Sequence, residues 1–160
     1  MMSPMSASSF NEFQVLSIRD LDEVYAWSKA QAVALHPDDP FIEWTAAWRR
    51  ESLQHYLATG WSMASRDPQN GRLRGVALAQ PILFFRQQTQ TVWLEYLAAE
   101  NESRTAELFQ VMIGIARDKH MQRLQFVTST LELPQVRSIA EQRRVRPVAD
   151  LVMELPTTKE

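Results

Sequence analysis

The chain has 160 residues, a formal net charge of -2 and no cysteine, and 45% of its residues are hydrophobic. This size and apolar content fit one domain with a substantial core. The small net charge argues against nucleic acid or anionic membrane as a partner, because both need a basic field. Without cysteine there is no disulfide framework, thiolate metal site or cysteine nucleophile, a pattern that fits a cytoplasmic protein.

The first third of the chain predicts one strand followed by two helices. Residues 1–12 are expected to be a disordered leader, and a short strand is expected over Phe13–Ile18. Asp20 is a suitable N-cap for a helix with one inward stripe, made of Leu21, Val24, Tyr25, Ser28, Ala32 and Leu35. A second helix is expected over Pro40–Thr59, because Asp39 supplies an N-cap followed by proline at the first helical position.

The remainder of the chain predicts strands interrupted by two helices. The strongest amphipathic pattern covers Ser103–Met121, and its wide apolar arc suits a helix lying on a sheet. A shorter helix is expected over Gln135–Gln142. The predicted strands are Trp61–Arg66, Leu73–Leu83, Thr91–Ala99, Gln122–Thr130 and Pro147–Leu155. The order β-α-α-β-β-β-α-β-α-β indicates a single α+β domain over residues 13–155, with a three-strand antiparallel meander and a tail over 156–160.

The second predicted helix carries two apolar stripes on roughly opposite sides. One contains Ile42, Ala46, Leu53 and Leu57, and the other contains Phe41, Trp44, Trp48 and His55. Either the remaining chain covers both stripes, since tryptophan is usually largely buried, or Trp44, Trp48 and His55 form an exposed surface for a substrate, a protein partner or a second copy of the chain.

Two local patterns, together with the order of the elements, resemble a known superfamily. The segment Ile139–Leu155 has a helix end, then a strand that starts near Arg-Pro and ends in Met-Glu-Leu, and Asn70–Ala79 has a hairpin in which glycine precedes an apolar run. Over Phe13–Leu155 the chain resembles the GCN5-related N-acetyltransferase (GNAT) superfamily. The resemblance implies a mixed, mostly antiparallel central sheet flanked by helices. It also implies transfer of an acetyl or other acyl group from acyl-CoA to an amine of a small molecule or protein.

The resemblance places acyl-CoA at the turn between the strand Thr91–Ala99 and the helix Ser103–Met121. The implied cofactor-binding residues are Leu97, Ala98, Ala99, Ser103, Arg104 and Thr105. The superfamily uses glycines here to bring backbone N–H groups close to the diphosphate. This turn has no glycine, and Glu100 and Glu102 repel an anion. The chain therefore resembles a divergent member with a degenerate acyl-CoA loop.

The last helix departs from the superfamily pattern as well. Ala140 stands where a tyrosine often acts as general acid for the leaving thiolate, and Arg144 and Val145 stand where Gly-Phe is expected. These departures keep a second function open, a non-catalytic interaction or regulatory module that has lost acyl-CoA binding.

Glu95 is the catalytic candidate. It lies in the apolar run Val92–Leu97, on the strand where members of the superfamily often carry a carboxylate that removes a proton from the acceptor amine. Desolvation by apolar neighbours makes a carboxylate a stronger base. The alternatives are a solvated carboxylate on the polar face of the strand or one paired with an arginine. Tyr96 is expected to point to the opposite face and into the core.

Two clusters of charged residues have weaker signals. His36, Asp38 and Asp39 are close in sequence, but this spacing fixes no metal geometry, and we assign no metal site. A basic cluster comprises Arg137, Arg143, Arg144 and Arg146, with Arg117, Lys119 and Arg123. It is either a solvated helix end or a binding site for a phosphate or an acidic partner.

Overall fold

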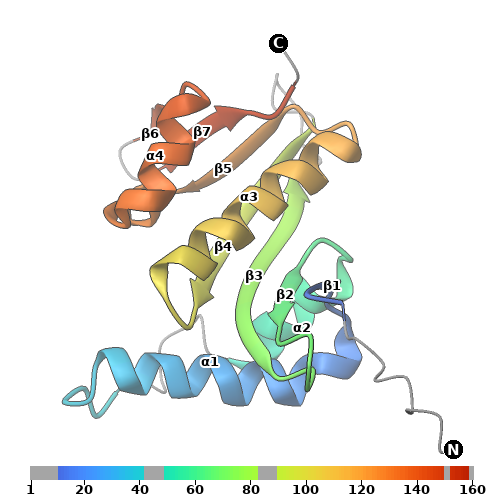
Figure 1. The fold of residues 1–160 in the computed structure, drawn as a ribbon, viewed down its shortest axis with the longest axis vertical. Helices are drawn as coiled ribbons and strands as arrows, with labels where there is room; N and C mark the ends of the chain where they lie inside the picture. Colours follow the sequence, from blue (N-terminus) through green and yellow to red (C-terminus); the bar gives the residue numbers. More distant parts are fainter. Residues whose placement is uncertain (1–10, 42–48, 83–89, 150–151, 159–160) are drawn as a thin grey trace, which may run out of the picture.

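A computed structural model describes residues 11–41, 49–82, 90–149 and 152–158 (Figure 1). Its helices are α1 (Leu21–Leu35), α2 (Arg50–Ala58), α3 (Glu102–Asp118) and α4 (Pro134–Gln142), with 3-10 turns η1 (Ile18–Asp20) and η4 (Thr128–Glu132). Its strands are β1 (Phe13–Val15), β2 (Met63–Arg66), β3 (Leu73–Ile82), β4 (Thr91–Ala99), β5 (Arg123–Val127), β6 (Arg146–Ala149) and β7 (Val152–Pro156). Within these residues, no helix combines the length and the apolar character needed to cross a bilayer.

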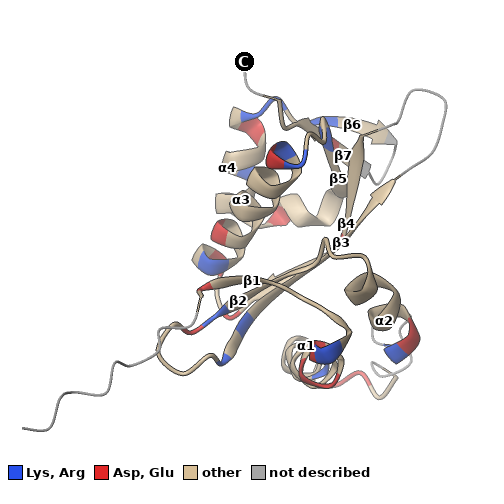
Figure 2. Ribbon diagram, turned by 90° about the vertical axis from the view of Figure 1, so that its right-hand side faces the viewer, with Lys and Arg blue, Asp and Glu red and all other residues tan. Residues whose placement is uncertain are grey.

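The strands form one sheet in the order β1-β2-β3-β4-β5-β7-β6. β4 and β5 run parallel, and the other neighbouring strands run antiparallel. α3 makes the crossover that a parallel pair requires. Helices α3 and α4 lie on one face of the sheet and α1 and α2 on the other (Figure 2). The predicted mixed, mostly antiparallel sheet, its flanking helices and the β2-β3-β4 meander are confirmed.

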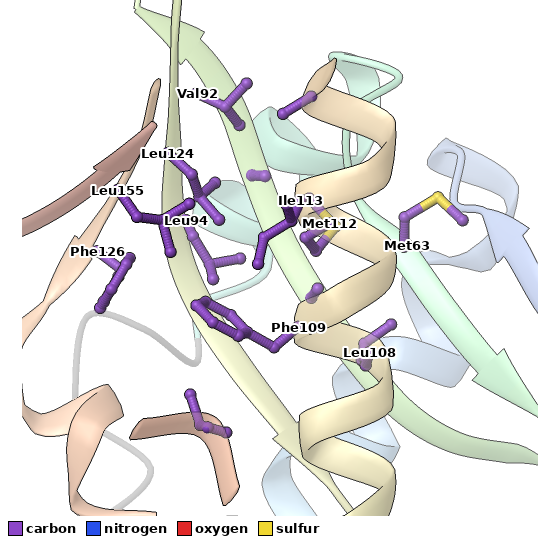
Figure 3. Close-up of a cluster of buried hydrophobic side chains, with 14 of the residues drawn as sticks. Met63, Val92, Leu94, Leu108, Phe109, Met112, Ile113, Leu124, Phe126 and Leu155 are labelled. Atoms are coloured by element: carbon purple, nitrogen blue, oxygen red, sulfur yellow. The ribbon is translucent and has the colours of Figure 1, made fainter. Parts of the chain in front are cut away.

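Helix α3 is the centre of the larger core (Figure 3). The helix begins after Asn101, whose side-chain oxygen accepts the N–H of Arg104 at 2.9 Å, as an N-cap does. Four residues of its wide apolar arc, Leu108, Phe109, Met112 and Ile113, are fully buried against the sheet. The Phe109 ring meets Phe126 of β5 edge-on, with centroids 5.4 Å apart, a favourable aromatic geometry.

Helices α1 and α2 form a second, smaller core on the opposite face. Its fully or almost fully buried members are Leu16, Val24, Leu53, Leu57, Ala64, Leu73, Val76 and Leu78. The inward stripe predicted for α1 holds at Val24, Ser28 and Ala32, which are buried. At the end of the helix Leu35 is 72% exposed, because α1 extends beyond the elements that it packs against.

The helix predicted over Pro40–Thr59 is shorter than expected. Pro40 and Phe41 form a turn, and α2 begins at Arg50. Asp39 accepts the N–H of Phe41 at 2.9 Å, the bond that an N-cap makes to the second residue after it, but neither Pro40 nor Phe41 is helical. Residues 42–48, including Trp44 and Trp48, lie outside the described residues.

The single strand predicted over Pro147–Leu155 is wrong, because this segment forms two antiparallel strands. β6 pairs with β7 through Pro147 and Met153, and β6 is the edge of the sheet, where a proline without an N–H is tolerated. β7 continues to Pro156. The buried Thr157 donates its N–H to Gln122 O at 3.0 Å, so the fold includes two residues of the expected tail.

Gly75 of β3 lies close against β4. A Cβ atom on this glycine would lie 2.9 Å from Ala99 Cβ and 3.2 Å from Ala98 O. Gly114, in the middle of α3, has no atom within 4 Å of the same position. Packing therefore requires glycine at position 75, whereas position 114 has room for a larger residue.

This contrast predicts opposite effects of the same substitution. Gly75→Ala is expected to lower the free energy of unfolding by about 1–3 kcal/mol, because neither contact atom is the end of a flexible side chain. Gly114→Ala is expected to raise it by about 0.5–1 kcal/mol, the usual gain in a helix interior. Urea unfolding of both variants checks this. A Gly75→Ala protein as stable as the parent would contradict the close approach of the strands.

Candidate functional site

The candidate site begins where β4 and β5 separate. Their pairing ends at Leu94 and Phe126, and beyond this point β5 turns into η4 while β4 continues beside β3 to Ala99. Figure 1 shows the two strands diverging from there. The last part of β4, which contains the predicted cofactor-binding residues Leu97, Ala98 and Ala99, therefore lies along an opening in the sheet.

A β-bulge on β4 lies at the same point. Ala79 of β3 pairs with Leu94, and the preceding Leu78 pairs with Tyr96, which leaves Glu95 as the extra residue. The bulge changes the alternation of side chains along β4. Tyr96 packs into the α1–α2 core, on the same face as Glu95. The expectation that these two side chains point to opposite faces is wrong, because regular alternation does not continue across a bulge.

Two neutral donors hold the Glu95 carboxylate. The Tyr56 hydroxyl of α2 donates to Oε2 at 3.0 Å, and the indole N–H of Trp93 donates to the same oxygen at 2.5 Å. Burial, and then the nearby Glu95 charge, raise the pKa of Tyr56, so its hydroxyl stays protonated and keeps donating. Glu95 itself is exposed. Among the described residues it is therefore a fixed and accessible carboxylate, bonded to Tyr56 and Trp93.

His55 lies next to this group on α2. Its Nε2 atom is 2.7 Å from Gln80 Oε1 of β3, and its ring meets the Tyr56 ring edge-on with centroids 5.4 Å apart. His55 is exposed. Of the predicted surface Trp44, Trp48 and His55, the structure thus describes the histidine, and it lies beside Glu95.

Polar side chains form a row across this face of the sheet. Five residues on neighbouring strands are register partners of one another, in the order Gln80 (β3), Trp93 (β4), Gln125 (β5), Glu154 (β7) and Arg146 (β6). Their neighbours Leu124 and Leu155 point the other way, into the α3 core. Gln125 and Glu154 of this row are buried and bond each other at 3.1 Å, so a molecule lying on the face opposite α3 would meet the less buried members Gln80, Trp93 and Arg146.

Donor groups of the predicted cofactor turn are bonded within the turn itself. The Asn101 side-chain oxygen accepts the N–H of Arg104. The Asn101 backbone carbonyl accepts both the N–H and the hydroxyl of Thr105, at 3.0 and 2.9 Å. The Arg104 guanidinium points to the β1–β2 side, where it donates to Glu12 at 2.9 Å and to Ser65 at 3.3 Å. Arg104 and Thr105 are thus engaged within the fold, whereas Ser103 is exposed.

The two carboxylates of the turn differ in what they contact. Glu100 lies between Arg72 and Arg74, at 2.6 and 2.8 Å. Burial opposes its ionisation, but the bond from Arg74 and the charge of Arg72 hold the pKa of Glu100 below its usual range, so its negative charge is matched locally. Glu102 accepts the N–H of Gln135 at 2.9 Å and so joins the first turns of α3 and α4.

Sequence reasoning missed Tyr56, Trp93 and Gln80. Trp93 is two residues before Glu95 on one strand, so its position on the same face was readable from the alternation. Tyr56 is 39 residues from Glu95 in the sequence, and no local pattern connects them. Their contact depends on how α2 packs on the sheet.

Comparison with known proteins finds likeness in structure. No protein-family model matches the chain, and no curated protein matches its sequence. PaiA N-acetyltransferase from Thermoplasma acidophilum, solved with coenzyme A, superposes with a TM-score of 0.65 at 15% identity, over 91% of this chain and 98% of its own. A probable acetyltransferase from Staphylococcus epidermidis superposes with a TM-score of 0.68 at 13% identity, over 93% of this chain and 100% of its own. A GNAT-family acetyltransferase from Listeria monocytogenes superposes with a TM-score of 0.64 at 6% identity, over 90% of this chain and 93% of its own. The chain has the GNAT fold that the sequence patterns predicted.

The contact between α3 and α4 predicts a specific loss of stability. Glu102→Ala removes a carboxylate that bonds an N-terminal N–H of α4, as an N-cap does, and is expected to cost about 1 kcal/mol. Glu107→Ala is the matched control, since Glu107 is exposed and lies 3.9 Å from Arg104; it should change stability by less than about 0.5 kcal/mol. Chemical unfolding measures both. Equal effects would show that the contact contributes nothing.

Proposed function

We propose that this GNAT-fold chain is an N-acyltransferase in which Glu95 takes the proton of an acceptor amine. The observation that carries the proposal is the position of Glu95, on a bulge beside the point where β4 and β5 separate. Support comes also from the structural neighbours, which are named as acetyltransferases, one of them in complex with coenzyme A.

The residues of this opening fit an acyl thioester arm. β4 extends past β5 through Leu97, Ala98 and Ala99, and two of these side chains are methyl groups, so a narrow chain can lie along the strand. When bound, the thioester of acetyl-CoA or another acyl-CoA supplies the acyl group. The diphosphate fits less well, because Asn101 caps α3 and Glu102 lies at its first turn. The arm, and not the diphosphate, would contribute most of the affinity.

Each residue near Glu95 has a distinct part in the proposed reaction. Tyr56 and Trp93 fix the Oε2 atom, so the carboxylate is oriented before the acceptor arrives. An amine whose proton has been taken by Glu95 can attack the thioester directly, without a covalent enzyme intermediate. The acceptor, a small molecule or a protein, would lie on the face that carries α1 and α2, where the exposed side chains of Glu95 and His55 lie.

The departing thiolate receives no proton from the last helix. Ala140, at the position compared with the superfamily's tyrosine, is 0% exposed and belongs to the α3 core. A thiol has an ordinary pKa of about 8.5, so the thiolate is a good leaving group and can take its proton from solvent.

One observation favours a second function. Because Glu102 joins α3 to α4 across the turn where the diphosphate is expected, the fold is closed there without a ligand. A protein that had lost acyl-CoA binding and served as an interaction module would have this feature.

Substitution of Glu95 tests the acyltransferase proposal. Glu95→Gln is expected to lower turnover at least about 100-fold, the usual contribution of a general base, while the shift in melting temperature produced by acetyl-CoA is retained. Gln80→Ala, which changes the same face without touching Glu95, serves as the control and should retain turnover within about tenfold. An active Glu95→Gln protein would remove Glu95 as the base. The absence of any thermal shift with acyl-CoA esters at millimolar concentration would favour the interaction module.

The charge at the turn gives a separate prediction. Glu102→Gln keeps the side-chain shape and an oxygen that can accept the Gln135 N–H, but removes a negative charge beside the helix N-terminus. The affinity for acetyl-CoA is expected to rise by about three- to tenfold in calorimetric titration at low salt. Glu107→Gln removes a negative charge more than one helical turn beyond Glu102 and should leave the affinity for acetyl-CoA unchanged. Equal affinities for all three proteins would show that the diphosphate does not bind near Glu102.

A further inference from the structure

Two hydroxyl groups join the end of α2 to β3. Thr59 follows the last residue of α2, and Ser62 comes just before β2. The Ser62 hydroxyl accepts the N–H of Ala79 at 3.1 Å and lies 3.2 Å from the carbonyl oxygen of Tyr56. The Thr59 hydroxyl lies 2.8 Å from the Tyr56 oxygen and 3.0 Å from the carbonyl oxygen of Ala79. Each hydroxyl therefore lies between the last turn of α2 and one residue of β3.

The hydrogen bonds of this hydroxyl pair, Thr59 and Ser62, can all be made at once. A hydroxyl donates one proton and accepts through its lone pairs. When Ser62 donates to Tyr56 O and Thr59 donates to Ala79 O, both carbonyl groups and the Ala79 N–H are bonded. Ser62 and Ala79 are 0% exposed, so loss of the Ser62 hydroxyl would leave a buried N–H without its partner. The connection between α2 and β3 is therefore specific.

Ala79 is also the residue of β3 that lies opposite the bulge. It pairs with Leu94, immediately before Glu95. It lies two residues past Ala77, where the pairing of β3 with β2 ends, and the hydroxyl pair bonds its N–H and carbonyl there. One residue is thus connected to Glu95 through β4 and to Tyr56 through the hydroxyl pair.

We propose that Thr59 and Ser62 are positioning residues for Glu95. They fix the last turn of α2 relative to the bulge, and this keeps the Tyr56 hydroxyl 3.0 Å from Glu95 Oε2. A carboxylate that is oriented before the acceptor arrives has less freedom to lose in the reaction. The inference rests on the proposed acyl transfer, and it assigns part of the control of that reaction to two hydroxyl groups that act through Tyr56.

Steady-state kinetics of hydroxyl-removing variants test the proposal. Ser62→Ala and Thr59→Val are each expected to lower kcat about tenfold and to leave the KM for acetyl-CoA within about twofold, because the orientation of the base is lost. Thr59→Ser keeps a hydroxyl and should retain the parent kcat. Ser28→Ala is the matched control, since Ser28 is also 0% exposed and, within the described part of the chain, its hydroxyl has no hydrogen-bond partner. An equal loss in Ser28→Ala would overturn the proposal.

A double variant separates positioning from a general loss of packing. In a Tyr56→Phe protein, the hydroxyl that holds Glu95 is already missing. Adding Ser62→Ala to that protein is therefore expected to change kcat by less than about twofold. A further tenfold loss would show that Ser62 acts independently of Tyr56 and would contradict the inference.

A third readout does not need turnover. Burial, and then the nearby Glu95 charge, raise the pKa of Tyr56. At about pH 11, one unit above the ordinary tyrosine pKa of about 10, NMR of labelled tyrosine rings should show Tyr56 protonated in the parent and in Ser28→Ala, but partly ionised in Ser62→Ala and Thr59→Val. An unchanged Tyr56 in both hydroxyl-removing variants would refute the positioning role. The expected change in a protein without acyl transfer would support that role and refute only the proposed function.

Discussion

The separation of β4 from β5 is the constraint on which the rest of the site depends. Two parallel strands paired over four residues then diverge, and β4 continues with β3 as its partner. The bulge at Glu95 occurs at that point, where β4 has lost the pairing on one side and can accommodate an extra residue. Glu95 faces α2, as alternation from Trp93 predicts, and Tyr56 bonds it there, while the bulge brings Tyr96 to the same face. The end of the pairing with β5 and the bulge thus lie together beside the Glu95 carboxylate.

Side chains of the chain itself accept N–H groups at the N-termini of α3 and α4. The positive ends of α3 and α4 lie close enough to share Glu102, and Asn101 caps α3. A carboxylate at a helix N-terminus is favourable for the same electrostatic reason that a bound phosphate is. The fold therefore keeps the helix arrangement of an anion site while its own side chains provide the negative charge.

Elements with strong local signals could be predicted from the sequence. β4 has the predicted bounds, and α3 begins one residue and ends three residues before the predicted positions, because its apolar arc is a local feature. The helix predicted over Pro40–Thr59 is wrong as one continuous helix, because Pro40 and Phe41 form a turn and Arg49 is not helical. The single last strand is wrong because a mostly apolar run of nine residues does not reveal whether it forms one strand or a hairpin, and pairing of its second half with β5 decided it.

By itself, the sequence determined the order of the elements up to the last strand and the absence of a glycine cradle, because both depend on residues close together in the chain. Its resemblance to the superfamily implied the GNAT-like fold and the candidacy of Glu95. The tertiary structure decided what Glu95 contacts, which side Tyr96 faces, that Glu102 bonds α4, and that Arg144 and Glu154 line one hollow. These contacts join residues from different elements, and their geometry follows from strand register and helix packing, which no local pattern specifies.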